Sequence, residues 1–365
     1  MKFYLPVRMF TGSGSVMEHA GDIASFGKKC LIVTGASSAK KSGALDDALA
    51  ALTEKGVSHV IYDKVAANPL LTSCIEAGKL GAESGAEFVL GIGGGSALDA
   101  ARAAAVFAAN PGMDENGLYS KVWPVKPLPI VLIGTTAGTG SEVTSVSVLT
   151  DSKGRKHSVS DPRLFAALSL GDPGYTRSMP FSVTVSTGID AFCHCAESYL
   201  SNSANAFSRA MAAAGIRLLY APLMKVMSGG EVSDSDRVDL YDASILGGVS
   251  ISVTGTCMPH NVGYFLTEKK GLPHGIACAV LFESMTDIVR ARDREKWNGF
   301  LKDTGFTADE ILTLVRGAVK DMKIELTASE IETELPRWEN NKSVKNTLGG
   351  VSTEDIRRAL GKFVK

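Results

Sequence analysis

Residues 87–109 read EFVLGIGGGSALDAARAAAVFAA, and this stretch decides the fold. The apolar run EFVL is typical of a buried strand, and the alanine-rich segment that follows is typical of a helix. Between them stands the sequence GIGGGS. Glycines at a strand-to-helix turn let the backbone approach a ligand closely, and the amide groups of a helix start favour phosphate. The stretch therefore predicts a phosphate-binding turn, the alternative being a tight turn without a ligand.

The same alternation of strand and helix continues on both sides of this turn. The runs KCLIVTG, SHVIYDKV, LPIVLIGTT and LFAALSLGDP are typical of buried parallel strands, and helical patterns separate them. This order predicts an α/β domain with a Rossmann-like parallel sheet. After Pro180 the strand signals stop, and long Ala-, Leu- and Met-rich segments such as residues 206–227 predict helices. We therefore expect an α/β domain over residues 1–178 and an all-α domain over residues 179–365.

The composition is that of a soluble globular protein, with 45% hydrophobic and 21% charged residues. Because 38 Lys and Arg balance 39 Asp and Glu, we expect neither a nucleic-acid partner nor a membrane partner. The amino-terminal residues lack the apolar core of about 7–15 residues that a signal peptide needs. Six cysteines without a CxxC pair indicate buried thiols rather than disulfides. These features predict a cytoplasmic protein.

Two further motifs carry polar side chains suited to ligand binding. Residues 134–142, GTTAGTGSE, follow an apolar strand and offer backbone and hydroxyl donors to a sugar, phosphate or carboxamide, or form a plain loop. Asp190 and His194 stand four residues apart, on one face of a predicted helix. His260 and His274 would lie about 21 Å apart on one unbroken helix, but Gly271-Leu272-Pro273 breaks it. The four side chains then suit a divalent iron or zinc ion, or are four unrelated polar residues.

Together these motifs resemble a known family. GGGSALDAAR, TTAGTGSEVT, STGIDAFCHCAESYLS and HNVGYFLTEKKGLPHGIACAV resemble, in order and spacing, the signatures of the iron-containing (group III) alcohol dehydrogenases. The resemblance implies a dinucleotide-binding domain and a helical domain, with the metal and the nicotinamide in the cleft between them. It also implies reversible hydride transfer between a primary alcohol or aldehyde and NAD(P). The family's metal ligands match Asp190, His194, His260 and His274.

The resemblance also assigns residues to the cofactor. The residues that it places around the dinucleotide are Asn68, Gly94, Gly95, Ser96, Thr135, Thr136, Thr144 and Lys156. Family members that prefer NAD often carry an aspartate where this chain has Gly35. The residues that would instead favour a 2′-phosphate, by small size, hydroxyl or positive charge, are Gly35, Ser37, Ser38 and Lys40. We therefore expect NADP(H) to be preferred over NAD(H).

The chain departs from the family pattern at several positions. Tyr264 stands where many members have a second histidine that has been considered a proton relay, so the relay is either its hydroxyl or water. Phe282-Glu283 replaces the family's Leu-Pro, which either reshapes the substrate pocket or is a helix variation. Iron is the expected ion, although the Irving–Williams order favours zinc. The apolar amino-terminal run FYLPVRMF suggests a strand that pairs across a homodimer.

Other functions remain as alternatives. Within the same superfamily they are glycerol-dehydrogenase-like polyol oxidation and a same-fold lyase. A lyase acting on sugar phosphates needs a dense Lys/Arg cluster, and none surrounds His260 or His274 in the sequence. A non-catalytic dinucleotide sensor is the alternative from another class, but a sensor has no need for four metal ligands.

Overall fold

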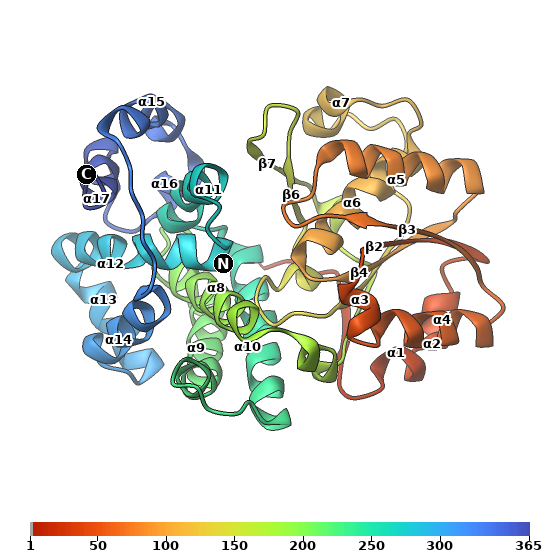
Figure 1. Cartoon of the computed structure of the whole chain (residues 1–365), viewed down its shortest axis with the longest axis horizontal. Helices are drawn as coiled ribbons and strands as arrows, with labels where there is room; N and C mark the ends of the chain where they lie inside the picture. The colour runs from red at the N-terminus through yellow and green to blue at the C-terminus, as the bar shows by residue number, and fades with distance from the viewer. Residues whose placement is uncertain (1–2) are drawn as a thin grey trace. The chain divides into compact units, whose positions relative to one another are not determined.

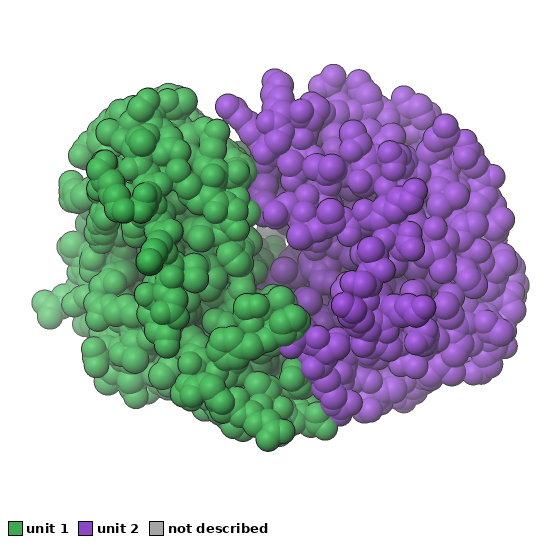
Figure 2. Space-filling model, viewed as in Figure 1, with its two compact units in different colours: residues 1–4, 180–365 green, residues 5–179 purple. Residues whose placement is uncertain are grey.

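The computed structural model describes residues 3–365, and the chain forms two compact units. One unit comprises residues 5–179, and the other comprises residues 180–365 together with Phe3 and Tyr4 (Figure 2). The predicted boundary lies one residue away from this division. The predicted first domain began at residue 1, but Phe3 and Tyr4 belong to the other unit. The Phe3 ring lies 4.1 Å from the ring of Phe207, which is in that unit. Residues 1–2 of that predicted domain lie outside the described residues.

The unit of residues 5–179 contains a parallel sheet, as predicted, and this sheet has six strands. The strand order is β1-β8-β5-β4-β2-β3, and every neighbouring pair is parallel. The strands are β1 (Arg8–Thr11), β2 (Lys29–Gly35), β3 (Ser58–Val65), β4 (Phe88–Gly93), β5 (Ile130–Gly134) and β8 (Leu168–Gly171). A separate antiparallel hairpin consists of β6 (Val146–Thr150) and β7 (Lys156–Ser160).

Helices cover both faces of this sheet, which explains why the four inner strands β2, β4, β5 and β8 are buried along almost their whole length rather than alternating. Leu31 and Val33 of β2 pack among α5 and α6, whereas Cys30 and Ile32 pack with α1, α2 and α4 on the opposite face (Figure 1). The α-helices of this unit are α1 (Ser15–Glu18), α2 (Ala20–Ala24), α3 (Ser38–Lys41), α4 (Ala44–Glu54), α5 (Leu71–Ser84), α6 (Gly95–Ala109) and α7 (Glu115–Ser120). Short 3₁₀ turns are η1 (Ser141–Val143), η2 (Pro162–Leu164) and η3 (Pro173–Ser178).

Two features of this unit differ from the sequence-based expectation. The amino-terminal strand is only β1, four residues long, and it pairs with β8 of its own sheet. Residues 3–7 lie outside it, and Pro6 among them has no backbone N–H to donate. The β6–β7 hairpin was not predicted, although the alternating run VSVLT and the turn-forming DSKG carry its signal.

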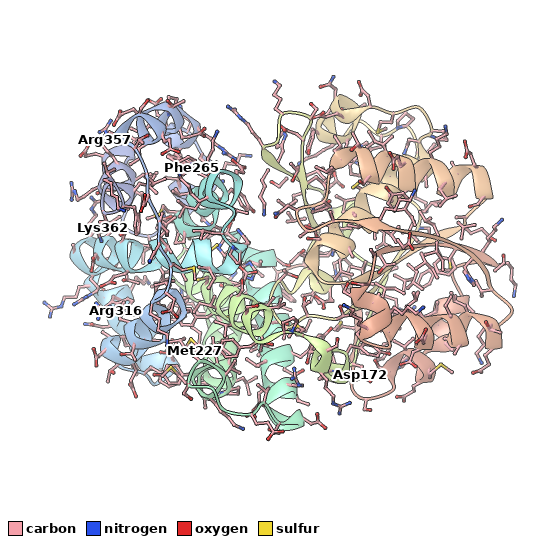
Figure 3. All side chains as sticks on the ribbon, viewed as in Figure 1. Asp172, Met227, Phe265, Arg316, Arg357 and Lys362 are labelled. Carbon is pink, nitrogen blue, oxygen red and sulfur yellow. The ribbon has the colours of Figure 1, made fainter. Side chains whose placement is uncertain are left out.

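The carboxylate of Asp172, labelled in Figure 3, terminates β8 and starts η3. It accepts hydrogen bonds from the backbone amides of Gly14 (2.8 Å) and Gly174 (2.7 Å). These bonds satisfy amides that would otherwise lack partners at a helix start. Asp172 therefore fixes the chain just before the second unit begins.

The second unit is helical, as predicted, and no described residue after Gly171 belongs to a strand. Its helices are α8 (Phe181–Tyr199), α9 (Ala206–Met227), α10 (Asp234–Thr254), α11 (Met258–Lys270), α12 (His274–Arg292), α13 (Arg294–Thr304), α14 (Ala308–Val319), α15 (Ala328–Glu339), α16 (Lys342–Asn346) and α17 (Thr353–Gly361). By length and composition α9 could cross a membrane, but here it packs against α8 and α10. A capping box at Ser352 starts α17.

Candidate functional site

Three helices of the second unit carry the predicted metal ligands. Asp190 and His194 lie one turn apart on α8, and His260 lies in the first turn of α11. Gly271 ends α11 in the left-handed conformation (φ 66°), and α12 begins at His274. The prediction that this segment breaks the helix is therefore confirmed, and the break lets the chain return to α8.

Glycines allow these helices to approach closely. A Cβ atom at Gly275 would lie 2.0 Å from the carbonyl oxygen of Ser186 and 2.8 Å from the Cβ of Asp190. Only a residue without a side chain fits at this crossing of α12 and α8. A Cβ at Gly263 would similarly lie 3.2 Å from the backbone of Ala277, where α11 meets α12. The ligands therefore converge because backbones, and not long side chains, form the helix contacts.

At this convergence lies a cluster suited to a cation. One ligand atom from each of Asp190, His260, His274 and Cys278 lies within 4.8 Å of all the others. Asp190 Oδ1 and His260 Nε2 lie 3.5 Å apart, and both are buried without a hydrogen-bond partner. A buried polar atom left without a partner costs about 1–3 kcal/mol. A divalent ion would satisfy both atoms, so the residues present fit a metal.

His194, the remaining predicted ligand, lies beside this cluster. Its ring stacks on the ring of His260, with centroids 4.5 Å apart, and it is buried. The four-atom group itself contains Cys278 and not His194. Sequence reasoning missed Cys278, although its position one turn after His274 was a readable signal. The histidines also act on Asp190: burial opposes its ionisation, but His194 and its neighbours hold its pKa well below the usual value.

A second carboxylate, Glu197, fixes the orientation of His260. Its Oε1 lies 2.6 Å from Nδ1 of His260, and its Oε2 accepts a hydrogen bond from the backbone amide of Cys257 at 2.7 Å. Because a carboxylate only accepts, Nδ1 carries the proton and Nε2 presents its lone pair to the cluster. Glu197 is fully buried and was also missed from sequence. Its position three residues after His194 puts it on the same side of α8.

In the first unit, the two glycine clusters lie against each other. Gly93 and Gly134 pair at the carboxyl ends of β4 and β5. A Cβ at Gly94 would lie 2.9 Å from Cγ2 of Thr136, and a Cβ at Gly95 would lie 2.7 Å from Cγ2 of Thr139. The turn before α6 and the following loop therefore form one surface of backbone and hydroxyl groups. Ser96, Thr135 and Thr144 belong to the same two segments.

This surface lies at the position where α/β sheets bind ligands. The strand order reverses between β2 and β4, so connections leave in opposite directions there. Ligands bind at the carboxyl ends of the strands at such a switch point. Gly35 ends β2, and Ser37, Ser38 and Lys40 are exposed at the start of α3. The residues predicted to contact the cofactor ribose thus follow the strand next to β4.

Comparison with known proteins identifies the family. The sequence model described as "Iron-containing alcohol dehydrogenase" matches residues 6–173, and the model of the family's C-terminal domain matches residues 184–333. The chain belongs to the iron-containing alcohol dehydrogenase family. It is an oxidoreductase that transfers hydride between an alcohol or aldehyde and a nicotinamide dinucleotide.

Individual relatives agree with this assignment. Long-chain-alcohol dehydrogenase 1 of Geobacillus thermodenitrificans is 32% identical over 292 residues, which are 79% of this chain and 73% of the relative. An iron-containing alcohol dehydrogenase from Thermotoga maritima superposes with a TM-score of 0.92 at 33% identity, covering 99% of this chain and 98% of that one. Sulfoacetaldehyde reductase from Bifidobacterium kashiwanohense, solved with NAD⁺, superposes with a TM-score of 0.87 at 25% identity and covers 99% and 98%.

The structure shows the contacts of the three residues at which this alcohol dehydrogenase departs from the family pattern. The ring of Tyr264 stacks on that of His274, with centroids 5.1 Å apart. The Tyr264 side chain therefore lies beside the candidate metal ligands. Phe282 is fully buried and packs edge-on against Phe192 of α8. Glu283 forms an ion pair of 2.5 Å with Arg316 of α14, labelled in Figure 3. Both replaced side chains therefore take part in contacts between helices.

The last two predicted cofactor residues of the enzyme are linked through β6. Asn68 adopts a left-handed conformation (φ 55°), and its carbonyl oxygen accepts a hydrogen bond from Oγ1 of Thr150 at 3.1 Å. Thr150 is in turn the cross-strand partner of Lys156 in the hairpin. Lys156 also acts electrostatically on Asp99 of α6. The hairpin therefore brings Asn68 and Lys156 into the neighbourhood of the glycine turn.

A buried ion pair, not predicted from sequence, holds the two cofactor segments together. The carboxylate of Asp99 accepts a hydrogen bond from Oγ of Ser141 at 2.8 Å. Arg102, fully buried, lies 3.2 Å from that carboxylate and donates to the carbonyl oxygens of Thr144 (3.0 Å) and Leu164 (3.1 Å). Both charges belong to α6 and most of their partners to the following loop. The pair therefore sets the distance between the glycine turn and that loop.

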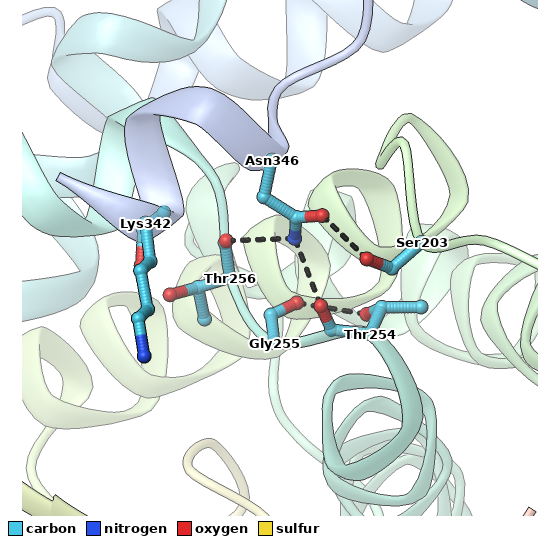
Figure 4. A pocket seen from close by; sticks show the side chains of 7 residues that line it. Ser203, Thr254, Gly255, Thr256, Lys342 and Asn346 are labelled. Atoms are coloured by element: carbon cyan, nitrogen blue, oxygen red, sulfur yellow. Dashed lines mark hydrogen bonds between the residues drawn. The ribbon is translucent and has the colours of Figure 1, made fainter. Parts of the chain in front are cut away.

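The dehydrogenase also has a polar pocket of about 230 Å³ in its helical unit (Figure 4). Its walls are formed by Ser203, Thr254, Gly255, Thr256, Lys342, Ser343 and Asn346. The amide of Asn346 donates to the carbonyl oxygens of Thr254 (2.8 Å) and Thr256 (3.2 Å), which orders the segment before α11. These hydrogen bonds therefore support the start of the helix that carries His260.

Proposed function

We propose that this enzyme interconverts primary alcohols and aldehydes at a divalent ion held by Asp190, His194, His260 and His274. The observation that carries the proposal is the pair of buried, unpartnered atoms Asp190 Oδ1 and His260 Nε2. When bound, the ion supplies Lewis acidity that favours alkoxide over alcohol. Iron is proposed as the resident ion, with zinc as the alternative.

The protein's own groups divide the remaining work. Glu197 keeps His260 in the tautomer whose Nε2 faces the cluster. Tyr264, stacked on His274, has a hydroxyl that can exchange a proton with the substrate oxygen, and water is the competing donor. The glycine turn, with Ser96, offers backbone amides to the cofactor pyrophosphate.

We further propose that NADP(H) is the preferred cofactor. The support is the absence of an acidic side chain between Gly35 and Lys41, together with the positive charges of Lys40 and Lys41. Steady-state kinetics should give a higher kcat/KM with NADPH than with NADH. Replacing Gly35 with Asp should reverse the order, because a carboxylate repels the 2′-phosphate and accepts the ribose hydroxyl. A wild-type enzyme faster with NADH would refute the preference.

We also propose an assembly and a compartment for the enzyme. Among the described residues β1 pairs only with β8, so its outer edge could accept a strand of a second copy in a homodimer. Light scattering of the purified enzyme tests this. All six cysteines are free and buried, which suits a reducing cytoplasm. Fractionation of the cells that produce the enzyme tests the compartment.

The experiment for the proposed function combines metal analysis with a substrate panel. The His274→Ala variant should lose the metal and nearly all activity with primary alcohols and aldehydes, yet still bind the dinucleotide. Dinucleotide binding is expected to persist because the glycine loops belong to the other unit. A His274→Ala enzyme with full turnover would refute the metal site. A panel in which glycerol or another polyol is turned over fastest would favour the polyol alternative.

A further inference from the structure

Cys278 stands out among the cysteines because its sulfur faces the metal cluster. It lies one turn after His274 on α12, and it is fully buried. Its Sγ lies 3.9 Å from Nδ1 and 3.8 Å from Nε2 of His274. It is also the fourth member of the group whose ligand atoms lie within 4.8 Å of one another.

These separations suit binding to a common ion. Metal–nitrogen bonds of about 2.1 Å and metal–sulfur bonds of about 2.3 Å place two neighbouring donor atoms roughly 3.1–3.6 Å apart. Asp190 Oδ1 and His260 Nε2 are 3.5 Å apart, and Cys278 Sγ and His274 Nε2 are 3.8 Å apart. These two pairs are therefore within a few tenths of an ångström of the separation expected for ligands of one ion, and all four atoms lie within 4.8 Å of one another.

The placement also repeats a pattern on the opposite helix. Asp190 and His194 lie at positions i and i+4 of α8, and His274 and Cys278 lie at positions i and i+4 of α12. Such a pair projects from one face of a helix. His260 of α11 completes the cluster from a third direction. Each of the two long helices thus carries two donors on one face, and three of these four donors belong to the cluster.

From this geometry we propose that the thiolate of Cys278 is a ligand of the catalytic ion, in addition to the proposed aspartate and histidine ligands. This inference rests on the metal site of the proposed function. On binding, the sulfur–hydrogen bond breaks, the sulfur donates its electron pair to the ion, and the proton leaves to solvent. A soft thiolate raises the affinity of the site for zinc and cobalt more than for ions that prefer oxygen ligands.

Cobalt substitution tests the proposal without relying on activity. The metal-depleted enzyme is loaded with Co²⁺, and its absorption spectrum is recorded. A thiolate ligand gives an intense near-ultraviolet charge-transfer band, whereas oxygen and nitrogen ligands give only weak visible ligand-field bands. The wild-type enzyme should show both. The Cys278→Ser enzyme should bind one cobalt ion and lose only the charge-transfer band.

A matched control isolates the position of the thiol. Cys195 is equally buried, and it lies on α8 directly after His194. Its sulfur is directed at Gly215, since a Cβ there would lie 2.7 Å away from it, so Cys195→Ala should keep the charge-transfer band. Loss of the Cys278 ligand should also lower zinc affinity by at least the roughly 10–100-fold that follows the loss of outer-shell partners.

The possible results separate this inference from the proposed function. A wild-type spectrum with ligand-field bands and no charge-transfer band would overturn the role of Cys278 and leave the metal site standing. A wild-type enzyme that binds no cobalt, zinc or iron would overturn both. The wild-type spectrum alone decides the question, so the test does not depend on whether the variants fold.

Discussion

Gly275 offers the most direct test of how the helix packing builds the metal centre. Changing it to alanine adds one methyl group at the crossing of α12 and α8. That methyl carbon would lie 2.0 Å from the carbonyl oxygen of Ser186, where ordinary contact begins at 3.4 Å. The shortfall of 1.4 Å is against backbone, which cannot rotate away, so α12 must move.

The size of the effect follows from this displacement. Overpacking a tight core costs about 1–3 kcal/mol, and occasionally more. Because the added methyl group meets backbone atoms, we expect Gly275→Ala to lower the free energy of unfolding by about 3 kcal/mol, the upper end of this range. A unit of this size loses about 2–4 °C in Tm for each kcal/mol, so the melting transition should fall by roughly 6–12 °C. Because His274 precedes Gly275 and moves with α12, metal affinity should fall as well.

The assay is thermal unfolding together with a metal-binding titration on the same preparations. Gly361→Ala is the matched control, because Gly361 lies in α17 and a Cβ there meets nothing within 4 Å. The control should unfold within about 0.5 kcal/mol of the wild type. If Gly275→Ala melts and binds metal like the wild type, the close crossing of α8 and α12 is not what assembles the site.

Three further predictions concern single side chains. Tyr264→Phe should slow turnover by about 10²–10⁴-fold if the hydroxyl carries the proton, and a pH–rate profile identical to wild type would assign the transfer to water. Glu197→Gln should weaken metal binding by roughly 10–100-fold by loosening His260, and a competition titration with a chelator that finds no change would contradict this role. Arg102→Ala should cost about 3–5 kcal/mol, because it strands the buried charge of Asp99. Chemical denaturation measures that loss, which Arg102→Lys should partly restore, and a fully stable alanine variant would be inconsistent with the ion pair described.

The sequence predicted those features that depend on local pattern. The range of α9 was predicted to the residue, because the segment is rich in helix-forming apolar residues and has a polar residue at each end. The inner parallel strands were predicted because both of their faces are buried, which leaves long apolar runs. The β6–β7 hairpin was missed because its exposed side carries serines and charges that also suit a loop.

The site divides in the same way. Spacing and resemblance predicted that Asp190 and the three histidines form one site, whereas Cys278 and Glu197 were not predicted. Their roles depend on which faces of α8 and α12 meet, and that is decided by Gly275 and its contact with Ser186. The burial of Arg102 was not predicted, because arginine side chains are mostly exposed to solvent.

The cluster of metal-binding side chains also affects the lifetime of the protein. Asp190 and His260 are 70 residues apart in the chain, and α9 and α10 lie between them. A covalent link closing a loop of that length would add about 4 kcal/mol by the chain-entropy estimate. An ion that binds the same residues links them reversibly. Its contribution to the free energy of unfolding grows with the logarithm of the free ion concentration. Chelator treatment of the producing cells should therefore shorten the half-life of the protein before its messenger RNA level changes.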